Sequence, residues 1–217
     1  MFDETLDSIK DKQALYSWFA SLYLQASTSK LLEPFSSPKT MNFLKAFFKD
    51  EPQQTALREL VACINKSSEG DLKNEYDSLF IVPSKRICVP PYESCFREKK
   101  GSDIGNLWGE TTADVAKFYR KAGYEVKNLQ GVFAPDHIGV ELAFIAKLCA
   151  DKLQYMKNHD SEQTRRVEEL RNSFLTEHIG TWIEDFSKAI DASSSSAFYK
   201  HLTQLTVHLV HSDLKNP

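Results

Sequence analysis

Apolar residues recur at helical spacing along most of this 217-residue chain. Spacings of three and four residues place side chains on one face of an α-helix, whereas no stretch alternates long enough to build a sheet. The sequence therefore predicts an all-α protein of roughly eight to eleven helices. The apolar stripes lie within 15–26, 41–48, 57–64, 72–80, 111–123, 138–155, 161–186 and 198–209.

The helical period is lost between Val82 and Gly109, where the chain contains three prolines and three glycines. A stretch of this length without structure is uncommon inside a domain, and such stretches are often functional. We predict one compact helical domain over residues 1–217, with a long central loop at 82–109. That loop is a candidate boundary between two helical halves that share one core.

The helix after this loop carries both of its expected end signals. Thr111 or Thr112 is placed to cap the first turn through its hydroxyl group. Gly123 follows the last apolar residues, where a left-handed backbone commonly ends a helix. We therefore predict a helix between these residues.

The segment FAPDHIGVELAFIAKL, residues 133–148, predicts a helix with acidic and histidine side chains at its start. Asp136 is placed to accept hydrogen bonds from the free N–H groups of this helix as its N-cap. At about 100° per residue, Glu141 falls inside the apolar stripe, and His137 lies one turn before it. Two interpretations stay open. The three residues satisfy structural partners, or they form a recognition site for a cationic, partly apolar peptide.

Composition and charge narrow the class of protein. With 27 basic and 30 acidic residues, the net charge is -3, which argues against a nucleic-acid-binding protein. The four cysteines form no CxxC pair, which indicates free thiols in a reducing compartment. No apolar run approaches ~18 residues, and the N-terminus lacks the pattern of a signal peptide. We expect a cytoplasmic protein without a membrane span.

The sequence also lacks the common motifs of catalysis. There is no HExxH helix, no GxSxG elbow and no GxxxxGK loop, so we assign no metal, no nucleotide and no other cofactor. We expect that the protein is not an enzyme. The alternative from this class is a small metal-dependent hydrolase that uses Asp136, His137 and Glu141, with His178 as a further candidate.

Several segments resemble the TorD/DmsD/NarJ family of redox-enzyme maturation chaperones. The most specific is PDHIGVELAFIAKL at Pro135–Leu148, which is similar to the family signature. EYDSLFIVP at Glu75–Pro83 resembles a helix end of that family, and PPYES at Pro90–Ser94 with LWG at Leu107–Gly109 resembles its central loop. The stretch His178–Phe186 resembles a helix of its C-terminal half. The likeness covers most of the chain.

The resemblance implies an all-helical cytoplasmic chaperone. Its partners would be the apo form of a molybdenum or tungsten oxidoreductase catalytic subunit and the twin-arginine signal peptide of that subunit. Binding would assist cofactor insertion and delay export, in a monomer or a homodimer. Carried over by position, with Glu141 added from its place on the helix, the candidate peptide-binding residues are Tyr76, Leu79, Phe80, Pro91, Tyr92, Asp136, His137 and Glu141.

Elementary chemistry agrees with this assignment. Arginine forms bidentate, charge-assisted bonds with carboxylates, and Asp136 is the first candidate for that role, ahead of Glu93 and Glu141. On this hypothesis Asp136→Asn weakens peptide binding and leaves the fold cooperative, because asparagine also caps helices. On the same hypothesis, His137 makes peptide binding sensitive to pH near neutrality. The remaining alternative is a helical scaffold that binds an unrelated partner helix.

Overall fold

All regular structure in the described part of the chain is helical. The structure is a computed structural model that describes residues 5–81, 88–97, 107–126, 134–193 and 197–215. Beside the helices, it contains one isolated bridge between Tyr92 and His137. The predicted all-α class is confirmed, and the eleven α-helices among these residues fall within the predicted number. The elements are α1 Leu6–Leu24, α2 Ser29–Leu32, a 3₁₀-helix Glu33–Ser36, α3 Pro38–Phe47, α4 Glu51–Lys66, α5 Glu69–Tyr76, a π-helix Asp77–Ile81, α6 Glu93–Arg97, α7 Glu110–Lys121, α8 Ile138–Lys157, α9 Ser161–Glu177, α10 Ile179–Ala192 and α11 Ala197–Lys215.

The chain forms two compact units. Unit 1 comprises Met1–Leu24, Tyr92–Trp182 and Leu214–Pro217, and unit 2 comprises Gln25–Pro91 and Ile183–Asp213. The change between units at Pro91 and Tyr92 falls inside the predicted loop. That the chain forms one domain with a shared core stays a prediction.

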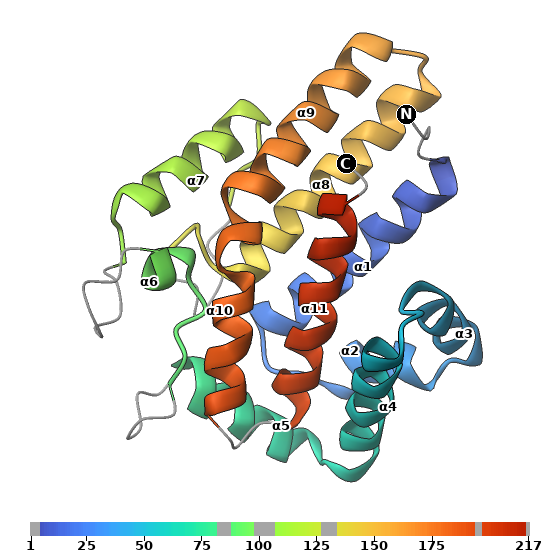
Figure 1. Ribbon diagram of the computed structural model, residues 1–217, viewed down its shortest axis with the longest axis vertical. Coiled ribbons are helices and arrows are strands. Elements are labelled where there is room, and N and C mark those ends of the chain that lie inside the picture. Colours follow the sequence, from blue (N-terminus) through green and yellow to red (C-terminus); the bar gives the residue numbers. More distant parts are fainter. Residues whose placement is uncertain (1–4, 82–87, 98–106, 127–133, 194–196, 216–217) are drawn as a thin grey trace. The chain divides into compact units, whose positions relative to one another are not determined.

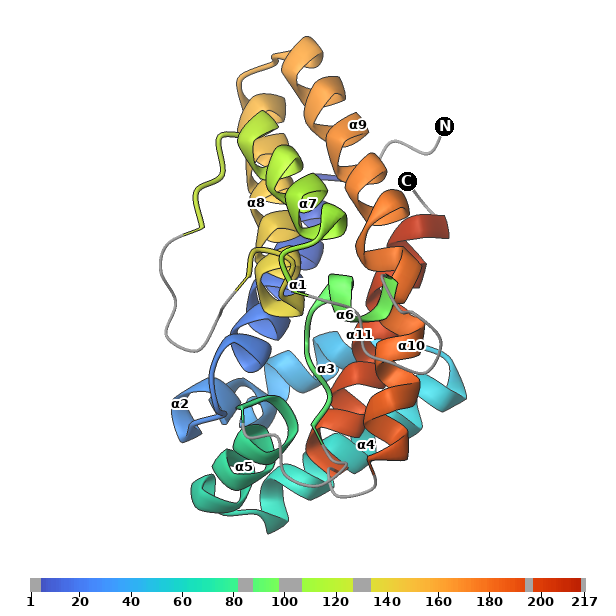
Figure 2. The ribbon, with the colours of Figure 1, turned by 90° about the vertical axis from the view of Figure 1, so that its left-hand side faces the viewer.

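Helix α8 is the central element of unit 1. It contacts α1 on one side and α9 on the other, as Figures 1 and 2 show. Ile138, Leu142, Ile145 and Cys149 are all buried on it, in agreement with the predicted apolar stripe. Lys152 also lies inside this stripe, and its ammonium group pairs with Glu168 of α9. The helix that begins at the most specific motif is therefore enclosed by its neighbours.

Gly139 permits the close approach of α1 and α8. A Cβ atom at this position would lie 2.6 Å from Cγ of Leu24 and 3.0 Å from the carbonyl oxygen of Ala20. Both contacts are shorter than packed atoms tolerate, and the carbonyl belongs to the backbone of a helix. We therefore expect Gly139→Ala to lower the free energy of unfolding by about 1–3 kcal/mol, the usual range for overpacking.

Urea unfolding of the two proteins measures this difference. Gly70→Ala is the matched control, because a Cβ there meets no atom closer than 3.6 Å and alanine favours a helix. If both substitutions change stability by the same amount, the close approach at Gly139 is not the cause.

Unit 2 contains a group of packed aromatic side chains around the end of α5. A capping box between Ser68 and Asp71 begins this helix, and the helix continues directly into the π-helix. The carboxylate of Glu75 accepts a hydrogen bond of 3.1 Å from the backbone N–H of Tyr199, which lies in the first turn of α11. These contacts fix the end of α5, where the sequence analysis placed part of the peptide site.

Two local predictions need correction. The prediction that Thr111 or Thr112 caps α7 is wrong, because the N-cap is Gly109 and no side chain bonds there. The predicted C-terminal end is confirmed: Gly123 has φ 61° and follows the last helical residues. Within the predicted loop, the structure adds the short helix α6, while residues 82–87 and 98–106 lie outside the described residues.

Candidate functional site

All eight predicted peptide-binding side chains are buried in this conformation. The structure divides them between its two units, so each group is a separate arrangement of neighbours. Unit 2 holds Tyr76, Leu79, Phe80 and Pro91, and unit 1 holds Tyr92, Asp136, His137 and Glu141. Their assignment to peptide binding stays a prediction.

The unit 2 group is an aromatic cluster. The rings of Tyr76 and Phe80 meet edge to face at 5.3 Å, and Phe80 meets Tyr199 in the same way at 4.9 Å. Phe80 also stacks on Phe186 at 6.4 Å. Leu79 is fully buried, and its carbonyl oxygen accepts from the N–H of Val89 at 2.8 Å. These side chains pack as a core does, and only small fractions of Tyr76 and Phe80 reach solvent.

Asp136 connects the start of α8 to α6 and α7. Its carboxylate accepts a 2.9 Å bond from the backbone N–H of Ser94 and a 3.1 Å bond from the hydroxyl of Thr112. Its carbonyl oxygen accepts from the N–H of Glu93 at 2.9 Å. The prediction that Asp136 caps its own helix is therefore wrong. It caps the first turn of α6 instead, across 42 residues of sequence.

His137 is the residue that caps α8. Its ring nitrogen Nδ1 accepts a 3.0 Å hydrogen bond from the N–H of Gly139. The ring also meets Tyr92 edge to face at 5.1 Å. Burial lowers the pKa of His137 to about 3. Burial disfavours the charged imidazolium, so this lowered pKa argues against the expectation that His137 makes binding sensitive to pH near neutrality.

The lowered pKa of His137 predicts sensitivity to acid. The unfolded chain binds a proton at this ring below about pH 6.5, while the folded protein does not until about pH 3. Stability is thus lost as pH falls through this window. We expect His137→Asn to reduce this loss by up to about 1.4 kcal/mol per pH unit, because asparagine caps α8 without titrating.

Urea unfolding between pH 4 and 7 compares the variant with the wild-type protein. The control is His201→Asn, because His201 is only part-buried and its ring pairs with Gln204. The prediction fails if the stability difference between His137→Asn and wild type stays constant across this range.

Glu93 is the centre of a second buried group in unit 1. Its carboxylate is completely buried and accepts a 2.6 Å bond from Nη1 of Arg97, one turn later on α6. It also lies 3.0 Å from Nδ1 of His178, whose ring packs between Phe118 and Phe174. A buried carboxylate needs such partners, because water no longer solvates its charge.

Glu141 completes this group from α8. Its Oε2 atom accepts a 3.2 Å hydrogen bond from the indole N–H of Trp182, while Oε1 has no partner when the group is charged. Burial, followed by the nearby charge of Glu93, raises the pKa of Glu141 well above its usual range. The protonated carboxyl group can donate to Glu93, which satisfies the remaining oxygen. We call Glu93, Arg97, Glu141, His178 and Trp182 the Glu93 cluster.

The two groups in unit 1 hold α6 against α8 and the adjoining ends of α9 and α10. Asp136, His137 and Glu141 were predicted from the sequence, with Glu93 as a second choice for binding arginine. Arg97 and Ser94 were not predicted, because the segment that contains them has the pattern of a loop. The spacing of Glu93 and Arg97, four residues apart as in a helical ion pair, was the signal available there.

The metal-dependent alternative finds no support in this geometry. Among the described residues, no three histidine, cysteine or acidic side chains are grouped as metal ligands. Nδ1 of His137 is already an acceptor for a backbone N–H, and Asp136 accepts from two donors. Both side chains already serve structural partners in this conformation.

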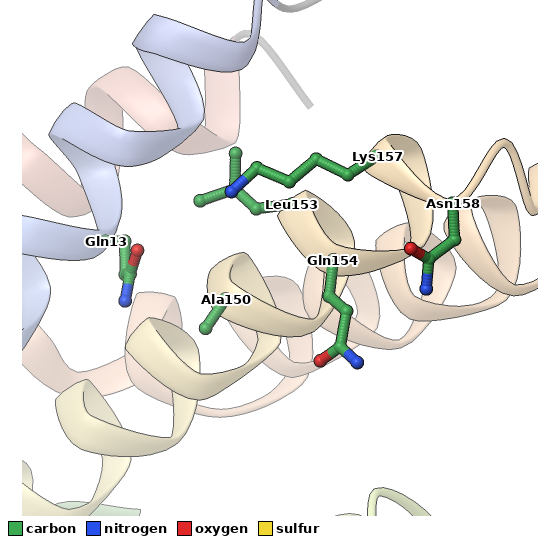
Figure 3. Close-up of a pocket in the computed structure, with 6 residues that line it drawn as sticks. All are labelled: Gln13, Ala150, Leu153, Gln154, Lys157 and Asn158. Carbon is green, nitrogen blue, oxygen red and sulfur yellow. The ribbon is translucent and has the colours of Figure 1, made fainter.

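An open pocket of about 370 Å³ lies elsewhere in unit 1, between α1 and the C-terminal half of α8. Figure 3 shows Gln13 of α1 facing side chains from the α8 side, several of which are exposed. No predicted peptide-binding residue lines it, and it contains no buried charged group. The pocket therefore gives no indication of a specific ligand. Its lining consists of Gln13, Ala150, Leu153, Gln154, Lys157 and Asn158.

Comparison with known proteins identifies the family. The profile of the family described as nitrate reductase delta subunit matches residues 49–188, which is more than half of the chain. The chain belongs to this family. The match includes α4 to α9, and with them the Asp136 contacts and the whole Glu93 cluster.

Curated relatives extend the similarity over nearly the full length. The chaperone protein TorD of Vibrio vulnificus strain YJ016 is 24% identical over 213 residues, covering 94% of both chains. TorD of Shewanella pealeana is 23% identical and covers 93% of this chain and 87% of its own. TorD of Colwellia psychrerythraea is 24% identical, with 94% and 92% covered.

These findings confirm the resemblance to the TorD/DmsD/NarJ family. The relatives carry the name of a chaperone and not of an enzyme, in agreement with the prediction for this chain. A search of the described helices finds none with the length and hydropathy needed to span a membrane.

Proposed function

We propose that this protein is a cytoplasmic chaperone for the catalytic subunit of a molybdenum or tungsten oxidoreductase. On this proposal it binds the apo subunit, its twin-arginine signal peptide, or both. Binding assists cofactor insertion and delays export until the subunit is mature. The observation that carries the proposal is the similarity to TorD chaperones over 94% of both chains, which includes the region of the Asp136 motif.

The geometry of unit 1 supports a binding role without catalysis. Asp136 and His137 each use their polar atoms to cap a helix, and Glu93 is bonded to Arg97 and His178. Such an arrangement orders backbone segments and provides no free nucleophile or general base. We propose that Asp136 and His137 position the α6 segment, which is the part of the site that a client meets.

The aromatic cluster of unit 2 is proposed to receive apolar residues of the client. Tyr76 and Phe80 retain small exposed fractions, of 7% and 8%, at the edge of otherwise buried packing. Aromatic side chains with one accessible edge are common anchors for apolar peptides, because they offer contact area at a low cost in conformational entropy. Leu79 and Pro91 are the further candidates in unit 2. Tyr92 is a separate candidate in unit 1, where Glu141 is a buried support.

Affinity capture from the native host, followed by mass spectrometry, tests this function. We expect a molybdopterin-dependent catalytic subunit among the captured proteins. Changing the paired N-terminal arginines of that subunit to lysines should weaken its capture if the signal peptide is recognised. If the subunit is still captured after this change, the chaperone recognises the body of the enzyme and not its signal peptide. Failure to capture any such subunit from cells that express it would overturn the proposal.

A further inference from the structure

Arg97 donates from one guanidinium nitrogen to two acceptors of unit 1. Its Nη1 atom donates to the carboxylate of Glu93 at 2.6 Å and to the backbone carbonyl of Glu177 at 2.9 Å. Glu93 belongs to α6 and is fully buried, whereas Glu177 is the last residue of α9. Two acceptors from separate helices therefore converge on one arginine nitrogen.

We propose that these two acceptors form a binding site for an arginine side chain of the client, and that Arg97 occupies it while no client is bound. The identity of the ligand as a client arginine rests on the proposed function. The site itself rests on the contacts of Arg97, Glu93 and Glu177. Neither the site nor its occupation by an internal residue follows from the family match.

The buried carboxylate makes this site demand a cation. Glu93 retains His178 as a neighbour if Arg97 leaves, but it loses its charged partner from α6. Leaving a buried charge without its counterion is strongly unfavourable. A guanidinium ion suits the vacancy better than an ammonium ion, because it is more weakly hydrated and presents several N–H donors in a plane.

Arg97 is suited to be displaced, whereas the acceptors are not. Its side chain is 39% exposed and it ends α6, while Glu93 is held by His178 and by the backbone contacts of Asp136. Exchange of one arginine for another keeps the charge and the number of hydrogen bonds nearly unchanged. The conformational freedom that Arg97 regains offsets the freedom that the incoming arginine side chain loses.

Chemical rescue tests the site directly. Arg97→Ala should lower the melting temperature, and ethylguanidinium at low millimolar concentration should raise it again in a saturable way. Ethylammonium at the same ionic strength should raise it much less. The matched control is Arg58→Ala, because Arg58 pairs with Glu51 at 3.0 Å on an exposed face of α4 and leaves no buried acceptor. The proposed site is overturned if ethylguanidinium and ethylammonium change the melting temperatures of Arg97→Ala and Arg58→Ala by equal amounts.

Peptide titration tests the client assignment. The probe is a synthetic peptide with two adjacent arginines followed by an apolar run, beside its double-lysine counterpart. If Arg97 leaves the site about a tenth of the time, Arg97→Ala should bind the arginine peptide roughly tenfold more tightly than wild type. Arg58→Ala should bind as wild type does. Unchanged affinity in Arg97→Ala would overturn the client assignment even if ethylguanidinium rescues the fold.

A measurement on the wild-type protein covers the case in which Arg97→Ala does not fold. The side-chain Nε–H resonance of Arg97 should shift when the arginine peptide is added, while that of Arg58 stays in place. A peptide that binds without moving the Arg97 resonance overturns the proposal. Capture of the client subunit is a separate readout, so the proposed function can stand when this site fails, and the site can stand when that function fails.

Discussion

Replacing Asp136 by alanine is expected to lower the free energy of unfolding by about 2–6 kcal/mol, because two buried donors lose their acceptor at about 1–3 kcal/mol each. The substitution leaves the backbone N–H of Ser94 and the hydroxyl of Thr112 without their acceptor. Because Asp136 is completely buried, water cannot replace the carboxylate at that position. The first turn of α6 should then detach from the start of α8.

Hydrogen exchange and urea unfolding measure the two parts of this effect. The amide of Ser94 should lose its protection in Asp136→Ala, whereas the amide of Gly139, which His137 holds, should keep it. Thr112→Val is the matched variant: it removes one donor and leaves the bond to Ser94, so its cost should be smaller, at about 1–2 kcal/mol. A protected Ser94 amide in Asp136→Ala would contradict this account.

The same contacts change the expectation for Asp136→Asn. From the sequence, asparagine was expected to weaken peptide binding and to leave the fold cooperative, because either residue can cap a helix. In the structure the two carboxylate oxygens accept from different donors, and asparagine has one acceptor oxygen only. Both contacts survive only if that oxygen keeps the bond to Ser94 and the hydroxyl of Thr112 turns to accept from the amide nitrogen. Protection of the Ser94 amide therefore has to be measured in this variant before a loss of peptide binding is assigned to the lost charge.

The helices were predictable because their signals are local. Apolar residues three and four apart mark α8 and the other long helices, and Gly123 marks the end of α7 through its own backbone preference. Short elements were not predicted, because a local signal needs several turns of helix to become visible. Helix α6 spans five residues, too few for a period to be visible, and it lies among prolines and glycines that indicate a loop.

The partners of the site residues were not predictable from the sequence. Asp136 bonds to residues 42 and 24 positions earlier, and Glu93 lies beside a histidine 85 positions later. Sequence spacing shows which residues share a helix face, but it does not show which distant segment covers that face. Asp136, His137 and Glu141 could be found because they lie close together on one predicted helix. The N-caps of α7 and α8 were assigned to the wrong residues.

These contacts give the motif a physical meaning. Asp136 caps α6 and the next residue, His137, caps α8. Glu141, one turn later, lies against Glu93 at the centre of the Glu93 cluster. Consecutive residues of one turn thus fasten two elements that the sequence places far apart. The position of α6, and with it that of Arg97, depends on them. On the proposed function, substitutions in the motif would weaken client binding through the position of α6, without a direct contact to the client.

Glu141→Gln is expected to stabilise the protein at and above neutral pH. The pKa of Glu141 is raised, because burial and the charge of Glu93 both disfavour the carboxylate. The folded protein therefore keeps a proton that the unfolded chain loses above about pH 4.5. The stability that this group contributes is complete below that pH and is lost as pH rises through the raised pKa, by up to about 1.4 kcal/mol per unit.

Glutamine reproduces the protonated acid without titrating. Its carbonyl oxygen can accept from the indole of Trp182, and its amide can donate to Glu93. Urea unfolding at pH 5, 6, 7 and 8 should show the variant and wild type close together at the acidic end and separating as pH rises. The other charged or titratable groups of this region are unchanged in both proteins, so the difference isolates one proton; they are Glu93, Arg97, Tyr119, Asp136, His137 and His178.

Glu93→Gln distinguishes this effect from a general response to removing an acid. Its single acceptor oxygen cannot serve Arg97, His178 and Glu141 together, so this variant should be less stable than wild type at every pH. The two substitutions are chemically identical and lie in one cluster, yet they are expected to act in opposite directions at pH 8. Parallel pH profiles for wild type and Glu141→Gln would show that Glu141 is already ionised in the folded protein, with its charge met by a donor in the cluster.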